Sequence, residues 1–341
     1  MSLLSYLAKR LLLAIGVLIG LSILVFIIAR VIPGDPARMA LGPRAPEYAV
    51  EALRKQMNLD KPIYIQYYLW LSNAIKGNLG DSLLTRRPVL EDIREYLPAT
   101  LEEVIIAAIF IIVGGIGLGI LAGKYSDTWL DGIVRIIAYL GIVTPAFAWA
   151  VILVLIFGYW IPLFPIQGRI SPGVKLPPTI TGMLTLDSLL TGNLVAFWDA
   201  LRHLLLLSLA LAMAPMAQAA RIMRSSITSE MELDYVPVLI SYGVPFNRIL
   251  TKYVSKSSLI PTLSVMILDI ASLTANAFAV ELVFNFPGLS RYGMQAILNK
   301  DLNAISGVLM IYGIIITLMV IVSDVIVAYL DPRIRLKGVS V

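Results

Sequence analysis

LLLAIGVLIGLSILVFIIA at residues 11–29 and VIIAAIFIIVGGIGLGILAG at residues 104–123 are the two stretches that decide the class of fold. Neither contains a charged residue, and a helix needs about 20 mostly apolar residues to cross the hydrocarbon of a bilayer. The first stretch follows Lys9 and Arg10, as in a secretory signal, but it is longer than a signal's apolar region and no small-x-small cleavage site follows it. We therefore expect both stretches to be membrane-spanning helices, the first of them uncleaved.

The composition of the chain agrees with a membrane protein. Of its 341 residues, 58% are hydrophobic and 14% are charged, against about 25% charged residues in soluble proteins. A soluble fold could not bury so much apolar surface, so the bilayer must supply part of the solvent. The net charge of +5 is typical, in a membrane protein, of basic cytoplasmic loops and not of nucleic-acid binding.

Four more apolar segments extend the prediction to six transmembrane helices, which makes the chain an all-α integral membrane protein. The alternating pattern of a membrane β-barrel is absent. The first helix lies in residues 1–30, and the others are predicted at residues 100–123, 134–160, 199–223, 258–284 and 302–330. Residues 31–98 form an extracytoplasmic insert with a helix from about Pro46 to Met57, and residues 99–341 form the core of the protein.

Basic residues beside the predicted helices orient them in the membrane, because cytoplasmic loops are enriched in Lys and Arg. With a cytoplasmic N-terminus, the inner segments hold 12 basic residues and the short outer segments hold 5. Both termini and the long loop 224–257 are then cytoplasmic, in the cell membrane. The outer segment 160–199 contains five Pro and four Gly, which predicts an ordered, stiff loop.

The sequence contains no catalytic or metal-binding motif. It has no cysteine, a single histidine (His203) and no P-loop, so we expect no catalytic residue, no metal site and no bound cofactor. His203 is expected to lie at the membrane interface. The run GGIGLG misses the spacing of a dinucleotide-binding loop, and its small residues Gly115, Gly119 and Gly123 predict close helix packing.

The cytoplasmic loop contains a short predicted helix, ELDYVPVLISYG, in which Pro237 suits the first turn and Gly243 a stop. This helix should present Val238, Leu239 and Tyr242 on one side. Such an apolar stripe can dock into a groove of another protein or pack against its own bundle, and periodicity alone leaves both interpretations open.

Polar residues inside the predicted helices point to a second candidate site. Thr262, Asp269, Ser272 and Asn276 fall on one face of the fifth helix, and an acid near the middle of a bilayer should face protein or water. This face either lines a translocation cavity or forms hydrogen bonds between helices. Asp324 is expected to pair with Arg333 or Arg335, and Glu281 to steady the loop Pro287-Gly288-Leu289 that follows it.

Six blocks of sequence resemble one family. The loop DYVPVLISYGVPFNRILTKYVSKSSLIP at residues 234–261 looks like the cytoplasmic EAA loop of the permease subunits of ABC importers, with Gly243 and Pro261 spaced as in the oligopeptide and dipeptide branch. VIPGDPA, ELVFNFPGLSRYGMQAI and the tail AYLDPRIR agree with that branch, as do GNLGDSL and LPATLE in the insert. These blocks span nearly the whole chain in the family's order.

The resemblance implies the partners of this chain. In that family a second permease, more often a different chain than an identical copy, encloses the pathway, two ATPase subunits dock on the EAA loops and use ATP and Mg, and an external binding protein delivers the substrate. Membrane lipid is a further partner and nucleic acid is not. The resemblance implies that the residues which couple this chain to the ATPase subunits are Asp234, Tyr235, Pro237, Val238, Leu239, Tyr242 and Gly243. The sequence departs from the motif at Val238, Leu239, Ser241 and Tyr242, where the family has small residues and a Lys.

The expected function is therefore that of a permease subunit of an ATP-driven importer, without enzymatic activity. The resemblance implies oligopeptides or dipeptides as substrates, with oligosaccharides as the alternative, and the lack of a His or Cys cluster argues against nickel. A secondary transporter would need inverted repeats, which are absent, and an intramembrane enzyme would need a nucleophile and a base at depth.

Overall fold

The computed structural model describes residues 3–31, 36–42, 44–56 and 58–330. Within these residues the chain forms helices and no β-strand, and an isolated bridge joins Asp81 to Pro88. The helices of the N-terminal part are α1 (Leu3–Val31), α2 (Pro36–Leu41), α3 (Glu47–Gln56), α4 (Ile63–Ile75) and α5 (Val89–Phe110), and the π-helical segment η1 (Ile111–Gly115) joins α5 to α6 (Ile116–Lys124).

The remaining helices follow in the core. They are α7 (Trp129–Val143), α8 (Ala146–Val154), η2 (Leu155–Trp160), α9 (Leu184–Leu190), α10 (Leu194–Met231), α11 (Tyr235–Ser241), α12 (Phe246–Arg248), η3 (Ile249–Val254), α13 (Ser255–Asn276), α14 (Phe278–Val283), α15 (Leu289–Leu298) and α16 (Leu302–Leu330). Five helical stretches of the described residues are long and apolar enough to cross a membrane, or six if the bent pair α7 and α8 counts as one span. The all-helical membrane fold expected from the sequence is confirmed.

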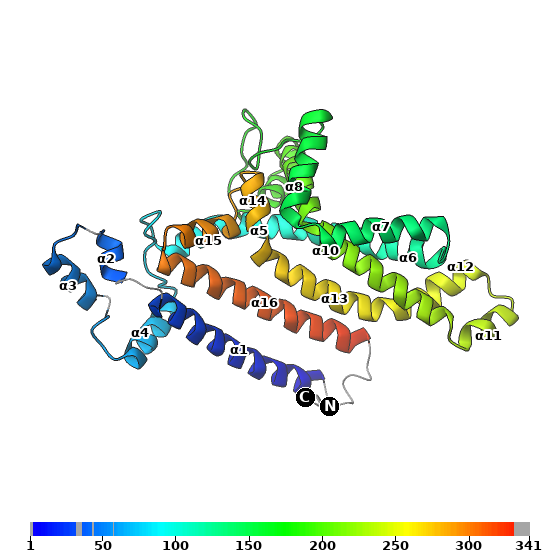
Figure 1. Ribbon diagram of the computed structural model, residues 1–341, viewed down its shortest axis with the longest axis horizontal. Coiled ribbons are helices and arrows are strands. Elements are labelled where there is room, and N and C mark those ends of the chain that lie inside the picture. The colour runs from blue at the N-terminus through cyan, green and yellow to red at the C-terminus, as the bar shows by residue number, and fades with distance from the viewer. Residues whose placement is uncertain (1–2, 32–35, 43, 57, 331–341) are drawn as a thin grey trace.

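The predicted third span is not one straight helix. α7 ends at Val143 and α8 begins at Ala146, and the chain bends by 110° between the two helices. Pro145 has no amide hydrogen and disfavours helical backbone at the residue before it, and Thr144 is accordingly extended, with φ −83° and ψ 122°. The sequence signal for this break is the dipeptide Thr144-Pro145 inside the apolar run. Figure 1 shows the result: α8 stands away from the long axis that α7 follows.

α10 is the centre of the bundle. It packs against α5, α6, α7, α8, α9 and α13, while α1 lies beside α16 (Figure 1). The close approach of η1 and α6 to α10 depends on small residues, since a Cβ on Gly115 would lie 2.6 Å from the Cβ of Ala219 and one on Gly123 would lie 2.7 Å from Cγ2 of Ile227. The packing role predicted for Gly115, Gly119 and Gly123 is confirmed.

Two polar side chains inside the helices have defined partners in the structure. Oδ2 of Asp324 lies 3.0 Å from Nη1 of Arg10, so its partner is on α1; Arg333 and Arg335, the expected partners, lie outside the described residues. This pairing follows from the packing of α1 on α16, which the local sequence does not reveal. His203 is buried at 4% exposure, and its Nδ1 lies 2.9 Å from the carbonyl oxygen of Asp199; its expected position at the membrane interface stays a prediction, because it concerns depth in the bilayer.

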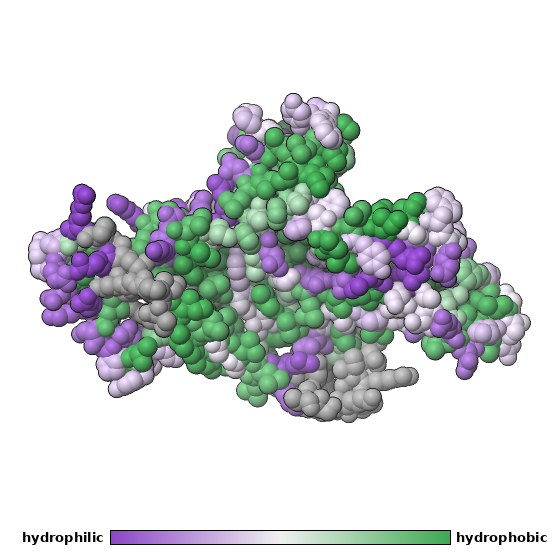
Figure 2. All heavy atoms as spheres, viewed as in Figure 1, coloured by the Kyte–Doolittle hydropathy of each residue, from purple (hydrophilic) through white to green (hydrophobic). Residues whose placement is uncertain are grey.

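The surface divides into apolar and polar regions along the long axis. Figure 2 shows hydrophobic residues over α8 and over much of the bundle, hydrophilic residues over α2, α3 and α4 at one end, and a hydrophilic band along α7 and α10. The predicted helix Pro46 to Met57 is found as α3, with Met57 itself outside the described residues. The helices α11 and α12 lie at the opposite end from α2–α4 (Figure 1).

Candidate functional site

The first candidate site is α11, which stands between the end of α10 and the start of α12. Pro237 occupies its first turn, where a missing amide hydrogen costs nothing. Gly243 ends the helix with φ +73°, a conformation that glycine adopts without steric cost. The amides of Gly243 and Val244 donate to the carbonyls of Ile240 and Leu239, at 2.9 and 3.1 Å. The sequence therefore builds a helix of about two turns, closed by Gly243, at the tip of the loop.

The side chains of α11 divide into a buried and an exposed set. Val236 is buried, and Leu239 packs with it against the core cluster that contains Ile227 and Ile249. Val238 is 51% exposed and Tyr242 81% exposed. Of the three side chains predicted to share one outward side, the structure leaves Val238 and Tyr242 exposed and turns Leu239 inward.

Three exposed apolar residues near α11 were not predicted. Leu233, Ile240 and Phe246 are 47%, 55% and 44% exposed, and together with Val238 and Tyr242 they form the tip surface. The apolar character of these residues is visible in the sequence, but their exposure depends on how the loop folds back. An exposed apolar patch on a short helix is typical of a protein docking site.

Tyr235 fixes the base of the tip to α10. Its hydroxyl donates to Oε2 of Glu230 at 3.0 Å, and burial together with this bond raises the pKa of Tyr235 to about 12. The phenol therefore remains a donor at neutral pH. Asp234 is exposed at the start of α11, and its side chain makes no capping hydrogen bond there.

The second candidate site is the polar face of α13, and its members lie in different surroundings. Thr262 is fully buried, and its hydroxyl donates to the carbonyl of Ser258 at 2.8 Å. Asp269 is half-buried, and its Oδ2 has no hydrogen-bond partner among the described residues. Ser272 donates to the carbonyl of Asp269, and Asn276 is exposed. The side chains form no hydrogen bonds with one another, so the face is not a preformed polar network within this chain.

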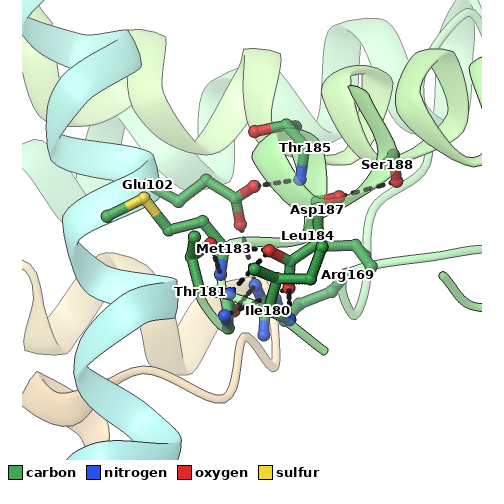
Figure 3. Close-up of polar contacts among 10 residues, drawn as sticks. Glu102, Arg169, Ile180, Thr181, Met183, Leu184, Thr185, Asp187 and Ser188 are labelled. Atoms are coloured by element: carbon green, nitrogen blue, oxygen red, sulfur yellow. Dashed lines mark hydrogen bonds and ion pairs between the residues drawn. The ribbon is translucent and has the colours of Figure 1, made fainter. Parts of the chain in front are cut away.

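A third polar region, which the sequence did not suggest, orders the loop before α9. Asp187 is buried, and it accepts hydrogen bonds from the amides of Ile180, Thr181 and Gly182 at 3.2, 2.8 and 3.1 Å and from the Thr181 hydroxyl at 2.7 Å (Figure 3). Burial alone would raise the pKa of Asp187, but these hydrogen bonds outweigh it and hold the pKa below its usual value. The ordered loop predicted for residues 160–199 is confirmed, and a buried carboxylate is what orders it.

Glu102 ties this loop to α5. Nη2 of Arg169 lies 2.8 Å from Oε2 of Glu102, and the amide of Thr185 donates to the other carboxylate oxygen (Figure 3). The same guanidinium donates to the carbonyl of Gly182 at 3.0 Å. Because Glu102 is buried, both charges of the pair are largely removed from water, and the loop is held rigidly against the bundle.

Glu281 holds the next loop, as predicted. Its carboxylate accepts from the Thr100 hydroxyl at 2.7 Å and from the amide of Arg291 at 2.6 Å. Thr100 in turn accepts from the amide of Leu289 at 2.7 Å. A Cβ on Gly288 would collide with the Glu281 carboxylate, so only glycine fits there. The loop Pro287-Gly288-Leu289 is thus fixed to α5 and α14.

Two family models match the chain and together cover nearly all of it. The model described as "binding-protein-dependent transport system inner membrane component" matches residues 115–336. The model for the N-terminal part of the same kind of membrane component matches residues 3–103.

Curated relatives match over almost their whole length. The probable D,D-dipeptide transport system permease protein DdpB of Escherichia coli K12 is 37% identical over 322 residues, which is 94% of this chain and 95% of that protein. The dipeptide transport system permease protein DppB of Alkalihalophilus pseudofirmus is 35% identical, over 97% of this chain and 99% of its own. The glutathione transport system permease protein GsiC of E. coli K12 is 31% identical, over 98% of this chain and 100% of its own.

Proposed function

The chain belongs to the family of inner membrane components of binding-protein-dependent transport systems, and from this premise we propose that its α11 couples the ATPase subunits to the transport pathway. The chain is a permease subunit of a peptide-importing ABC transporter, and it is not an enzyme, because the ATPase of such a system is a separate subunit. A secondary transporter and an intramembrane enzyme are thereby excluded.

The observation that carries the coupling proposal is the exposed apolar tip surface of Leu233, Val238, Ile240, Tyr242 and Phe246. Among the described residues nothing covers these side chains, and the tip is tied to the long helix α10 through Tyr235 and Glu230. A displacement of the tip by a docked ATPase would therefore be transmitted to α10, the helix that contacts most of the bundle. ATP and Mg are used by the ATPase subunits, not by this chain.

The assembly we propose contains a second homologous permease, two ATPase subunits and an extracytoplasmic substrate-binding protein. A different chain is preferred to a second copy as the partner permease, because the family usually pairs two different chains. The ATPase-docking tip is cytoplasmic in this proposal, and both chain termini lie on that side.

The proposed substrates are short peptides. The printed names of the relatives refer to dipeptides, D,D-dipeptides, di- and tripeptides and glutathione, all of which carry peptide bonds and terminal charges. None of these four names refers to oligosaccharides, so these remain the second candidate. The half-buried carboxylate of Asp269, with one unpaired oxygen, is the group of α13 best suited to contact a charged solute or water in the pathway.

The proposal can be tested on the transporter isolated through a tag on this chain. We expect the wild-type complex to contain a second permease and P-loop ATPases and to hydrolyse ATP when a peptide-loaded binding protein is added. The variant Tyr242→Ala removes the most exposed aromatic ring of the tip and should lower the amount of co-purified ATPase severalfold.

Tyr48→Ala is the matched control, because Tyr48 lies on α3 and is 78% exposed, close to the 81% of Tyr242. This variant should leave the ATPase content unchanged. Equal ATPase content in both variants and the wild type would refute the role of the tip. Uptake of peptide by the chain in liposomes without ATP would refute the importer itself.

A further inference from the structure

A second feature of the molecule, apart from the tip and the α13 face, is a cavity between α6, α7 and α10. Its volume is about 230 Å³, and the side chains of Arg135, Arg221 and Arg224 line it together with Tyr139 and Ser225. One water occupies about 30 Å³ in the liquid, so a tetrahedral anion such as a phosphate group fits with room to spare. The rest of the lining is alanine and valine.

The charges around the cavity leave it positive. Asp131 is fully buried, and both of its oxygens are engaged by Arg224, at 2.8 Å to Nε and 2.7 Å to Nη2. Arg135 reaches the same carboxylate only at 3.5 Å. Asp127 lies 3.9 Å from Arg224 and is 88% exposed, so water screens its charge.

Arg221 makes a hydrogen bond to the neutral amide oxygen of Gln218, at 2.8 Å, and no ion pair with any described carboxylate. The guanidinium groups of Arg135 and Arg221 thus have unused donors in the lining of the cavity, while Arg224, which also lines it, is held in place by Asp131. Guanidinium groups bind phosphate oxygens through paired hydrogen bonds.

The surroundings of the cavity favour a lipid as the source of the phosphate. On α7, the apolar side chains Ile133, Ile136, Ile137 and Leu140 are 45–60% exposed and flank Arg135 along a helix of the bent span. The exposed rings of Trp129 and Tyr139 lie on the same helix, and such aromatic residues gather where the hydrocarbon meets the headgroups. The hydrophilic band along α7 and α10 in Figure 2 is bordered by hydrophobic surface.

We propose that this cavity binds the phosphate of an anionic phospholipid headgroup, with Arg135 and Arg221 as its ligands and the acyl chains along the exposed face of α7. Basic pockets between transmembrane helices are a known way to hold such headgroups. Arg221 lies about 15 Å before the end of α10, from which α11 follows, so the bound lipid would brace the helix that carries the tip.

The test uses the whole transporter in nanodiscs of phosphatidylcholine and phosphatidylglycerol in equal parts, with the bound lipids counted by native mass spectrometry. The wild type should retain phosphatidylglycerol selectively. The double variant Arg135→Gln/Arg221→Gln should raise the amount of phosphatidylglycerol needed to half-saturate the cavity about thirtyfold. Each basic residue near an anionic surface changes the binding constant about fivefold, and two are removed. Arg135→Lys/Arg221→Lys should keep most of the binding, since lysine also binds phosphate.

The control is Lys175→Gln/Lys300→Gln, which removes two exposed positive charges outside the cavity and should not change lipid retention. Unchanged subunit content and unfolding temperature in all three double variants exclude misfolding as the cause of any loss of lipid. Equal retention in the Arg135 and Arg221 variant would overturn the proposal. So would displacement of the lipid by inorganic phosphate, which would indicate a site for soluble anions, or by the transported peptide, which would place the cavity in the translocation pathway.

Discussion

At the scale of single residues, Asp187 accepts four hydrogen bonds and so orders the loop before α9. Three consecutive amides and one hydroxyl converge on its carboxylate, and without it these donors would lose their charged acceptor. Sequence reasoning predicted an ordered loop from its prolines and glycines, but it could not identify the residue that orders it. The acceptor comes from the following helix, α9, and only the folded loop brings the two together.

We expect Asp187→Asn to loosen residues 180–182, because an amide oxygen is a weaker acceptor and its NH₂ group cannot replace the second oxygen. The local cost should be about 1–3 kcal/mol, which hydrogen exchange of these amides would measure as lost protection. The matched control is Asp60→Asn, the same change at an exposed aspartate outside this loop, which should leave the protection of residues 180–182 unchanged.

The lowered pKa of Asp187 gives this protection a pH dependence of known sign. The ionised carboxylate is bound better in the folded loop than in the unfolded one, so its contribution is complete above the ordinary aspartate value of about 4. It is lost as the pH falls through the lower value of the folded state. Protection that decreased on raising the pH from 4 to 7, after correction for intrinsic exchange, would contradict this assignment.

At the scale of elements, the contact between α6 and α10 can be tested with two glycines of the same helix. A Cβ on Gly119 would collide with the side chain of Met223 and lie 2.9 Å from the carbonyl oxygen of Ala220, whereas a Cβ on Gly117 would meet nothing within 4 Å. Gly119→Ala should therefore destabilise the subunit by about 1–3 kcal/mol through overpacking.

Gly117→Ala should be neutral or stabilising, by up to about 1 kcal/mol, since alanine favours a helix over glycine. Unfolding temperatures of the two variants in the same detergent provide the comparison. If both variants lost the same stability, the cause would be backbone flexibility of α6 and not its packing on α10.

At the scale of the whole molecule, the orientation in the membrane is a prediction that the chain itself makes easy to test. It contains no cysteine, so a single introduced thiol reports its own side of the membrane without background. Lys175 and Ser241 are both exposed and lie in the outer loop and at the end of α11. In intact cells, we expect a membrane-impermeant maleimide to label Lys175→Cys and to leave Ser241→Cys unlabelled.

Permeabilised cells serve as the control, because both thiols should then react fully. Labelling of Ser241→Cys in intact cells would place α11 outside and would exclude its contact with ATPase subunits. Labelling of neither variant before permeabilisation would place the 160–199 loop inside and refute the predicted number of crossings.

The sequence by itself determined the class of fold and the family. Long uncharged stretches can be satisfied only as helices in a bilayer, and Gly243 suits the positive φ with which the short helix of the loop ends. Pro237 and Gly243 likewise specify a short helix wherever the loop lies.

The tertiary structure alone decided which groups meet. The pairing of Asp324 with Arg10, of Glu102 with Arg169 and of Asp131 with Arg224 joins residues far apart in the chain, and no periodicity encodes such a pairing. It also decided that Leu239 turns inward while Val238 and Tyr242 remain exposed. The physical reason is that local sequence fixes backbone conformation and amphipathic faces, whereas burial and partners depend on which helices lie against each other.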